Sequence, residues 1–134
     1  ISMTCGSIKL QLRKLQKTDS LLRVNLGSDY ETILNNYITN LNLRLVKNNR
    51  ASSDLTSLQT TFSSERERFK SDFTTYAKSL DELIDLDCKN NPYDFYKKLE
   101  STRILRSDVR ASYLRLKDIL SWHRSAVFTL KESL

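Results

Sequence analysis

The stretch DCKNNPYD, residues 87–94, predicts the end of one helix and the start of the next. Asn91 is a favourable N-cap, Pro92 suits the first helical position, and Asp94 would face the positive end of the following helix. Because the residue before a proline disfavours helical backbone, the preceding helix has to stop before Pro92. We therefore expect a short connection here, with Cys88 at the end of the incoming helix.

The composition favours long helices on both sides of this connection. The chain has 134 residues, of which 39% are hydrophobic and 28% charged, with only two glycines and one proline. A β-rich fold with many tight turns would use more of both residues. We expect an all-α protein with a single domain over residues 1–134.

Apolar residues recur every three or four positions in both flanking segments, which is the spacing of a helix seam. The pattern predicts helices at about 53–88 and 92–133, and Ser52-Ser53-Asp54 offers capping groups for the first. The first seam contains Leu55, Leu58, Phe62, Glu65, Phe69, Phe73, Tyr76, Leu80 and Leu83. The second contains Phe95, Leu99, Thr102, Arg106, Val109, Tyr113, Leu116, Leu120, His123, Val127, Leu130 and Leu134.

A third helix is expected at about 6–49. Gly27 weakens it, because glycine inside a helix costs about 1 kcal/mol relative to alanine. The seam spacing continues across Gly27, so we expect a kink there, and a full reversal that makes four helices is the alternative. The seam contains Ile8, Leu12, Leu15, Asp19, Leu22, Leu26, Tyr30, Leu34, Tyr37, Leu41, Leu45 and Asn48.

The only two cysteines, Cys5 and Cys88, would meet at one end of a three-helix arrangement that reverses near Arg50. We expect an elongated antiparallel three-helix bundle with heptad seams, clasped at that end by a Cys5–Cys88 disulfide. Such a bond is typical of proteins outside the reducing cytosol. In the four-helix alternative the two Cα atoms would lie beyond the roughly 7 Å that a disulfide allows. Two reduced thiols in a cytosolic protein are the other alternative.

The charges follow the same three segments. Residues 1–50 carry eight basic and three acidic side chains, residues 51–91 five and eight, and residues 92–134 nine and five. An acidic helix between two basic ones suits packing of all three, although each exposed ion pair is worth only about 0–1 kcal/mol. The net charge of +6 keeps open a role in binding nucleic acid or an anionic surface.

Two charged residues, Asp19 and Arg106, lie on seam positions. Each is fourteen residues from the cysteine end, counted from Cys5 and from Pro92. We expect them to lie level with each other, with Asp72 nearby on the middle helix, as a polar layer that fixes the register. A buried acid–base pair in a site is the alternative.

The remaining polar and aromatic candidates are His123, Trp122, Tyr93, Tyr96 and residues 65–68. His123 has no metal-binding residue three or four positions away, so we expect it in or beside the core. Trp122, Tyr93 and Tyr96 are expected either to pack on the bundle or to contact a partner, since tryptophan and tyrosine are enriched at interface hot spots. Residues 65–68, Glu-Arg-Glu-Arg, indicate a solvated face with self-paired charges.

The sequence lacks the motifs of common catalytic sites. It has no glycine-rich phosphate loop, no CxxC or HExxH motif, and no serine or cysteine nucleophile with a plausible histidine base. We therefore expect no enzymatic activity, no cofactor, no metal site and no small-molecule substrate.

Two groups of residues resemble a known kind of protein. One comprises Arg23-Val24-Asn25-Leu26-Gly27, Tyr30-Glu31 and Ile33-Leu34, and the other Ile84-Asp85-Leu86-Asp87-Cys88, Asn91-Pro92 and Phe95-Tyr96. They are similar to uncharacterised helix-rich extracytoplasmic proteins of ultrasmall episymbiotic bacteria, over most of residues 20–110. The resemblance implies a cell-surface or secreted location, with a signal or anchor helix upstream of a helical ectodomain. It implies no activity and no functional residues.

Three functions remain as expectations. The first is a non-catalytic extracytoplasmic structural or binding module, in a cell-surface assembly, with a protein partner or self-association and an anchor in sequence outside this chain. The second is a cytosolic coiled-coil scaffold fragment with reduced cysteines. The third is a basic binder of nucleic acid or of an anionic surface.

Overall fold

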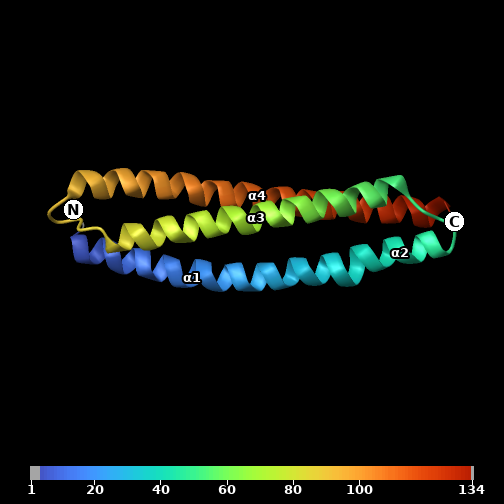
Figure 1. Cartoon of the computed structure of the whole chain (residues 1–134), viewed down its shortest axis with the longest axis horizontal. Helices are drawn as coiled ribbons and strands as arrows, with labels where there is room; N and C mark the ends of the chain where they lie inside the picture. Colours follow the sequence, from blue (N-terminus) through green and yellow to red (C-terminus); the bar gives the residue numbers. More distant parts are fainter. Residues whose placement is uncertain (1–3, 134) are drawn as a thin grey trace. The chain divides into compact units, whose positions relative to one another are not determined.

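The computed structural model describes residues 4–133, and within them it contains helices and no strand. The elements are α1 (Cys5–Thr32), a π-helix η1 (Ile33–Ile38), α2 (Thr39–Lys47), α3 (Ser53–Asp85) and α4 (Pro92–Ser133), as Figure 1 shows. Since α1, η1 and α2 follow one another without a break, the chain forms three long helical segments. The all-α class is confirmed.

Side chains cap the starts of α1 and α3. The backbone N–H of Ser7 donates to Thr4 Oγ1 (3.1 Å) at the start of α1, and the N–H of Leu55 donates to Ser52 Oγ (3.3 Å) at the start of α3. Each of these bonds satisfies one of the N–H groups that a helix start leaves without an internal partner.

The connection from α2 to α3 begins with a left-handed residue. Asn49 has φ 57°, a conformation that asparagine tolerates better than most residues. The N–H of Asn49 donates to the Val46 carbonyl (3.1 Å) and the N–H of Arg50 to the Leu45 carbonyl (2.7 Å). This pair of bonds is a Schellman motif, which satisfies the last carbonyls of α2. The second segment begins soon afterwards at Ser53, in agreement with the expected break near Arg50.

The connection from α3 to α4 is organised by Asp87. Its Oδ1 accepts hydrogen bonds from the backbone N–H groups of Lys89 (3.0 Å) and Asn90 (3.1 Å), which lowers the pKa of the Asp87 carboxyl, the bonds from Asn90 contributing most. Because these bonds favour a turn over further helix, α3 ends at Asp85 and Cys88 lies in the turn. The predicted helix end at residue 88 was therefore too late.

The irregularity of the first segment lies beyond Gly27. Gly27 is inside α1, and the helix continues to Thr32 before it widens into η1. The alternative of a chain reversal at Gly27 is therefore wrong. A π-helical turn holds one residue more than an α-helical turn, so the next inward-facing position comes one residue later. Accordingly Ile38 is 1% exposed while Tyr37, which the seam placed inside, is 65% exposed.

The chain divides into two compact units. Unit 1 comprises Ile1–Leu26 and Lys70–Arg110, and unit 2 comprises Gly27–Phe69 and Ala111–Leu134. Each unit therefore contains a part of all three helical segments. A single domain over residues 1–134 stays a prediction.

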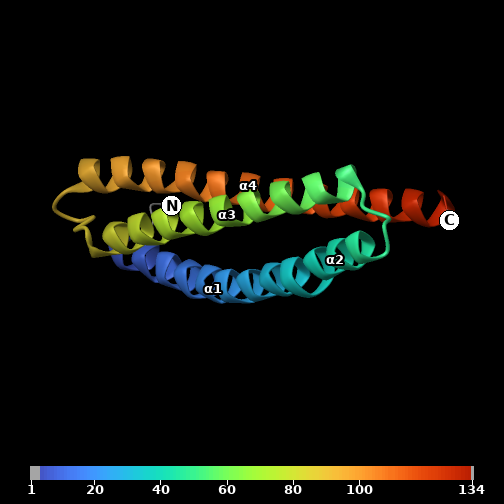
Figure 2. The ribbon, with the colours of Figure 1, turned by 45° about the vertical axis from the view of Figure 1, so that its right-hand side comes forward.

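Unit 1 is closed by a covalent bond. Cys5, in the first turn of α1, forms a disulfide with Cys88, and their Cα atoms lie 5.7 Å apart. Figures 1 and 2 show the start of α1 beside the turn between α3 and α4. A polar pair, Ser79 Oγ and Thr102 Oγ1 at 2.7 Å, lies buried between α3 and α4. The buried apolar residues of the unit are Phe73, Tyr76, Leu80, Leu83, Ile84, Phe95 and Val109.

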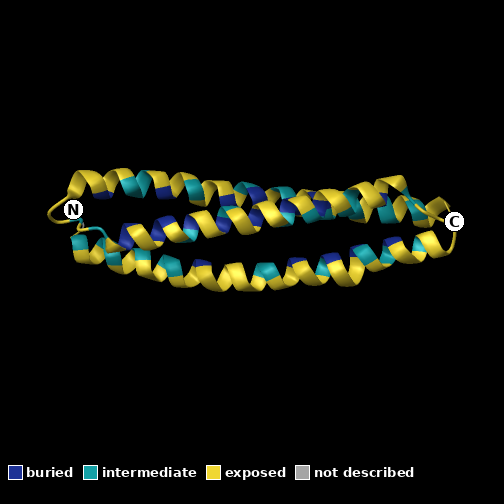
Figure 3. Cartoon of the chain, viewed as in Figure 1, coloured by how far each residue is buried: buried dark blue, intermediate teal, exposed yellow. Residues whose placement is uncertain are grey.

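Unit 2 has an aromatic core. The ring of Tyr30 meets those of Phe62 and Phe69 edge to face, with centroids 6.1 and 5.4 Å apart. Asn42 is buried and its Nδ2 donates to the Leu55 carbonyl at 3.1 Å, which ties α2 to the start of α3. Figure 3 shows buried residues recurring along α3. The buried apolar residues of the unit are Tyr30, Leu34, Ile38, Leu55, Phe62, Phe69, Leu116 and Ile119.

A single deletion tests the origin of the π-helical turn. Deleting Asn35, an exposed residue of η1, should convert that turn to an α-helical one and keep Ile38 facing inward. We expect a change in the free energy of unfolding below about 1 kcal/mol, whereas deleting exposed Asn25 of α1 rotates the rest of the helix and should cost more than about 2 kcal/mol. Urea unfolding followed by circular dichroism measures both, and equal losses would contradict the assignment.

Candidate functional site

The first polar cluster, in unit 1, joins all three helical segments. Arg106 of α4 donates from Nε to Asp19 Oδ2 (3.0 Å) and from Nη2 to Oδ1 (3.4 Å). The hydroxyl of Tyr76 of α3 donates to the same Oδ2. The Asp19 side chain is 8% exposed and that of Arg106 53% exposed, so the cluster opens to solvent on the arginine side. The structure thus brings together Asp19 and Arg106, as the seam positions predict.

The third predicted member of this layer, Asp72, is half-buried on α3. The residue of α3 that donates to Asp19 is Tyr76, one turn further along the helix. Tyr76 was placed on the seam as an apolar residue, and its hydroxyl was overlooked. A tyrosine on a seam position opposite a buried carboxylate could have indicated this bond, because a buried hydroxyl needs a partner.

Electrostatics favour the neutral phenol and the charged guanidinium in this cluster. Burial, reinforced by the hydrogen bond to Asp19, raises the pKa of Tyr76 above its ordinary value of 10.0. The hydrogen bond to Asp19 raises the pKa of Arg106. The cluster links all three helical segments, and neither Tyr76 nor Arg106 titrates near neutral pH.

A second polar cluster, in unit 2, was missed by sequence reasoning. Glu65 is buried and accepts a hydrogen bond from Arg115 Nε, while Arg115 Nη2 donates to Ser112 Oγ at 2.9 Å. The pairing expected within residues 65–68 is present, since Arg68 Nη1 lies 3.9 Å from Glu65 Oε1 and Arg66 Nη1 lies 3.8 Å from Glu67 Oε1. The expected exposure to solvent is wrong for Glu65, which is buried. Its place on the α3 seam was the available signal, since a seam position faces the neighbouring helix.

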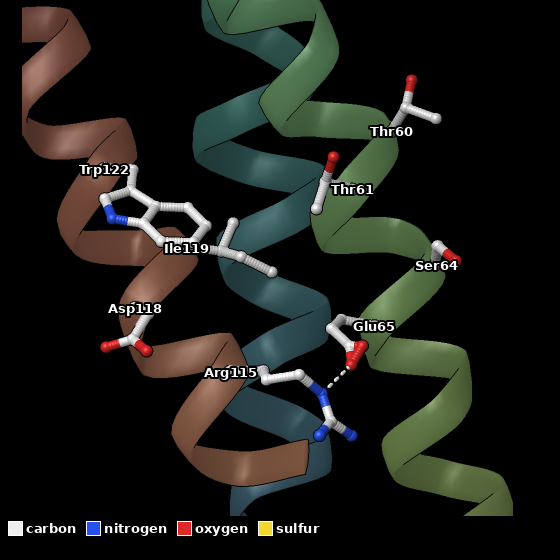
Figure 4. Close-up of a pocket in the computed structure, with 8 residues that line it drawn as sticks. All are labelled: Thr60, Thr61, Ser64, Glu65, Arg115, Asp118, Ile119 and Trp122. Carbon is white, nitrogen blue, oxygen red and sulfur yellow. Dashed lines mark hydrogen bonds and ion pairs between the residues drawn. The ribbon is translucent and has the colours of Figure 1, made fainter. Parts of the chain in front are cut away.

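A groove of about 420 Å³ lies beside this second cluster, between α3 and α4 of unit 2. Figure 4 shows its two sides, with the ion pair of Glu65 and Arg115 at one end and the indole of Trp122 at the other. Ile119 lies between them and is 2% exposed. The lining residues are Thr60, Thr61, Ser64 and Glu65 from α3, and Arg115, Asp118, Ile119 and Trp122 from α4.

The three aromatic residues that we expected either to pack on the bundle or to contact a partner are all exposed. Trp122 is 58% exposed in the wall of the groove, and Tyr93 and Tyr96 are 70% and 59% exposed in the first turn and a half of α4. The Lys97 ammonium lies 5.2 Å from the centroid of the Tyr93 ring. Tyr93 and Tyr96 lie in unit 1, and Trp122 lies in unit 2.

His123 is half-buried on α4, and its Nε2 is buried without a hydrogen-bond partner in the described part of the chain. Burial lowers the pKa of this imidazole, so the neutral form is favoured. Within residues 4–133 there is no cluster of histidine, cysteine and acidic residues that could hold a metal ion. The helices described here include none with the length and apolarity needed to cross a membrane.

Comparison with known proteins adds no relative. No family model matches the chain, and no curated protein or solved structure is significantly similar to it. The resemblance to extracytoplasmic proteins of episymbiotic bacteria stays a prediction.

The Tyr76 hydroxyl predicts a specific dependence of stability on pH. Because its pKa is raised on folding, the stabilisation is fully present below pH 10.0, where an unfolded tyrosine titrates, and is lost as the pH rises toward the higher folded value. Tyr76→Phe should therefore flatten the alkaline fall in the free energy of unfolding, and should cost about 1–3 kcal/mol at neutral pH by leaving Asp19 with one donor fewer.

Urea unfolding from about pH 8 to 11.5 measures this slope. Tyr93→Phe, which changes an exposed hydroxyl, is the matched control and should keep the wild-type slope. Tyr30, whose pKa burial also raises, keeps part of the slope in both variants. Identical slopes for Tyr76→Phe and the wild type would contradict the assignment.

Proposed function

We propose that this chain is a non-catalytic structural or protein-binding module that works outside the reducing cytosol, built as an elongated antiparallel three-helix bundle. The observation that carries the proposal is the disulfide between Cys5 and Cys88, which are 83 residues apart in sequence. Bonds of this kind persist in secreted and cell-surface proteins and are rare in the cytosol. The same bond argues against a cytosolic scaffold with reduced cysteines.

The order of the cross-helix contacts supports the antiparallel arrangement of α1 and α3. In unit 1, Gln16 bonds to Asp81 (3.3 Å) and Arg23 to Thr74 (2.9 Å), so the partner's number falls as the α1 number rises. In unit 2, Glu31 lies 3.9 Å from Arg66, which continues the same order within the segment.

Contacts between α3 and α4 also support an antiparallel pair, because the α3 number falls as the α4 number rises. In unit 1, Lys98 Nζ lies 2.6 Å from Glu82 Oε2, and Thr102 bonds to Ser79. If α3 runs opposite to both α1 and α4, then α1 and α4 run in the same direction, and the contact between Asp19 and Arg106 supports this part of the proposal.

A binding role is supported by the large side chains that the described surface leaves open to solvent. Trp122 and Tyr93 are more than half exposed. Tryptophan and tyrosine supply much of the binding energy at protein interfaces. The polar clusters, in contrast, are occupied in bridging helices, and each charged group in them already has a partner.

The redox state of the cysteines in living cells tests the proposed compartment. Intact cells that produce the protein are treated with a membrane-impermeant maleimide, with and without prior exposure to a membrane-impermeant reductant. We expect labelling of Cys5 and Cys88 only after the reductant, because both are oxidised and outside the cytosol. Two thiols that react only after cell lysis, without reductant, would contradict the proposal and favour the cytosolic scaffold.

A second candidate, binding to an anionic surface, is favoured by the outer face of α1. Leu10, Leu21 and Val24 are 53%, 59% and 68% exposed, and Lys14 and Lys17 lie between them at the three-or-four-residue spacing of one helix face. An apolar stripe mixed with lysine is typical of helices that bind membrane surfaces.

Vesicle binding tests this second candidate. We expect the wild type to sediment with vesicles that contain about 30% phosphatidylserine, and Lys14→Gln with Lys17→Gln to weaken binding about thirtyfold at low salt, because each lysine near an anionic surface contributes about 1 kcal/mol. Lys70→Gln with Lys78→Gln on α3 is the charge-matched control. Equal binding to neutral vesicles, or no binding, would dismiss this candidate.

A further inference from the structure

We propose that the groove between α3 and α4 of unit 2 binds an arginine or lysine side chain that a partner protein presents. The inference rests on the proposed binding role and names the chemistry of the partner. Four observations support it: an exposed indole, an unpaired carboxylate, a guanidinium that is already occupied, and a line of hydroxyl oxygens.

The aromatic wall of the groove is suited to a cation. Trp122 borders the groove of about 420 Å³ and is 58% exposed, so its side chain is accessible to a ligand in the groove. A cation over an aromatic ring is attracted by the ring quadrupole, and tryptophan gives the strongest such contact among the side chains. Buried Ile119 supplies an apolar floor for the methylene groups of a long side chain.

The charges of the lining favour a cation over an anion. Glu65 is buried and bound by Arg115, which also donates to Ser112, so the one guanidinium of the groove is committed to bonds inside the protein. Asp118 lies one turn before Trp122 on α4, and within residues 4–133 its carboxylate has no hydrogen bond or ion pair. An incoming cation would thus find an unpaired carboxylate beside the indole.

The opposite wall offers hydroxyl oxygens as acceptors. The hydroxyls of Thr60 and Thr61 donate to the carbonyls of Thr56 (3.4 Å) and Ser57 (3.0 Å) on their own helix. Their oxygen lone pairs remain able to accept, and Figure 4 shows both residues on the α3 side of the groove. Guanidinium and ammonium groups carry only donors, so they complement this wall.

We expect the partner to be a different protein and not a second copy of this chain. The chain carries a net charge of +6, so two copies repel each other at long range. A foreign protein that presents one arginine or lysine on an otherwise acidic surface would be attracted to the chain as a whole and to the groove locally.

The fluorescence of the single tryptophan reports directly on the groove. The oxidised protein is titrated with a blocked glycine peptide that carries one arginine, with the same peptide carrying one lysine, and with an isosteric neutral peptide in which citrulline replaces arginine. We expect saturable changes in Trp122 emission with the two cationic peptides, weakening as salt is raised, and none with the citrulline peptide.

Two variants with matched controls locate the site. Asp118→Asn should weaken binding of the arginine peptide about fivefold and Trp122→Phe about fivefold, the latter followed by calorimetry because the fluorophore is lost. Asp108→Asn removes an exposed carboxylate elsewhere on α4, and Phe128→Ala removes an exposed aromatic ring further along it. Both controls should bind as the wild type does.

Four outcomes would overturn the proposal. Equal binding of the citrulline peptide would show a site for neutral ligands, and equal weakening by Asp108→Asn would show non-specific attraction. No emission change at millimolar peptide would show that the groove binds no such cation. If no peptide binds but the cysteines are oxidised and outside the cytosol, the proposed groove is wrong and the proposed location still holds. The two proposals can therefore fail independently. Self-association in sedimentation, lost in Trp122→Phe, would show that the occupant is a second copy.

Discussion

The disulfide between Cys5 and Cys88 is the constraint on which unit 1 depends. It fixes the first turn of α1 against the turn between α3 and α4, with Cα atoms 5.7 Å apart and 83 residues between them in sequence. In the chain-entropy model, closing so long a loop removes conformations of the unfolded chain worth up to about 4.5 kcal/mol. With the disulfide formed, α1, α3 and α4 of unit 1 meet at the polar cluster of Asp19, Tyr76 and Arg106.

Those polar residues define the register more sharply than the apolar seams do. An apolar seam tolerates a shift by one heptad, because leucine can replace leucine, whereas a displaced Asp19 would leave both Arg106 and Tyr76 without their partner. Glu65 and Arg115 place the same requirement on unit 2. Each cluster favours one alignment of the helices, at some cost in stability, because a shift would leave its charged groups without partners. Glu65 and Arg115 also form one end of the groove.

The sequence allowed prediction of what depends on local spacing. The α3 seam is buried almost throughout, since a 3/4 pattern without glycine or proline has one helical solution, and Asn91-Pro92 marked the start of α4. The π-helical turn was not predictable, because Tyr37 and Ile38 are both apolar and either could face inward. The burial of Glu65 was not predicted, since its pairing with Arg68 suggested a solvated face, and its other partner Arg115 is 50 residues away.

The account is tested most directly by mapping the disulfide in protein purified without reductant. Free thiols are first blocked, the chain is cleaved by a protease, and the linked peptides are identified by mass spectrometry. The account predicts one linked pair, containing Cys5 and Cys88 of the same chain, and no blocked thiol. Blocked cysteines, or bonds that join Cys5 to Cys5 or Cys88 to Cys88 of two chains, would contradict it, because the start of α1 would then not lie beside the turn before α4.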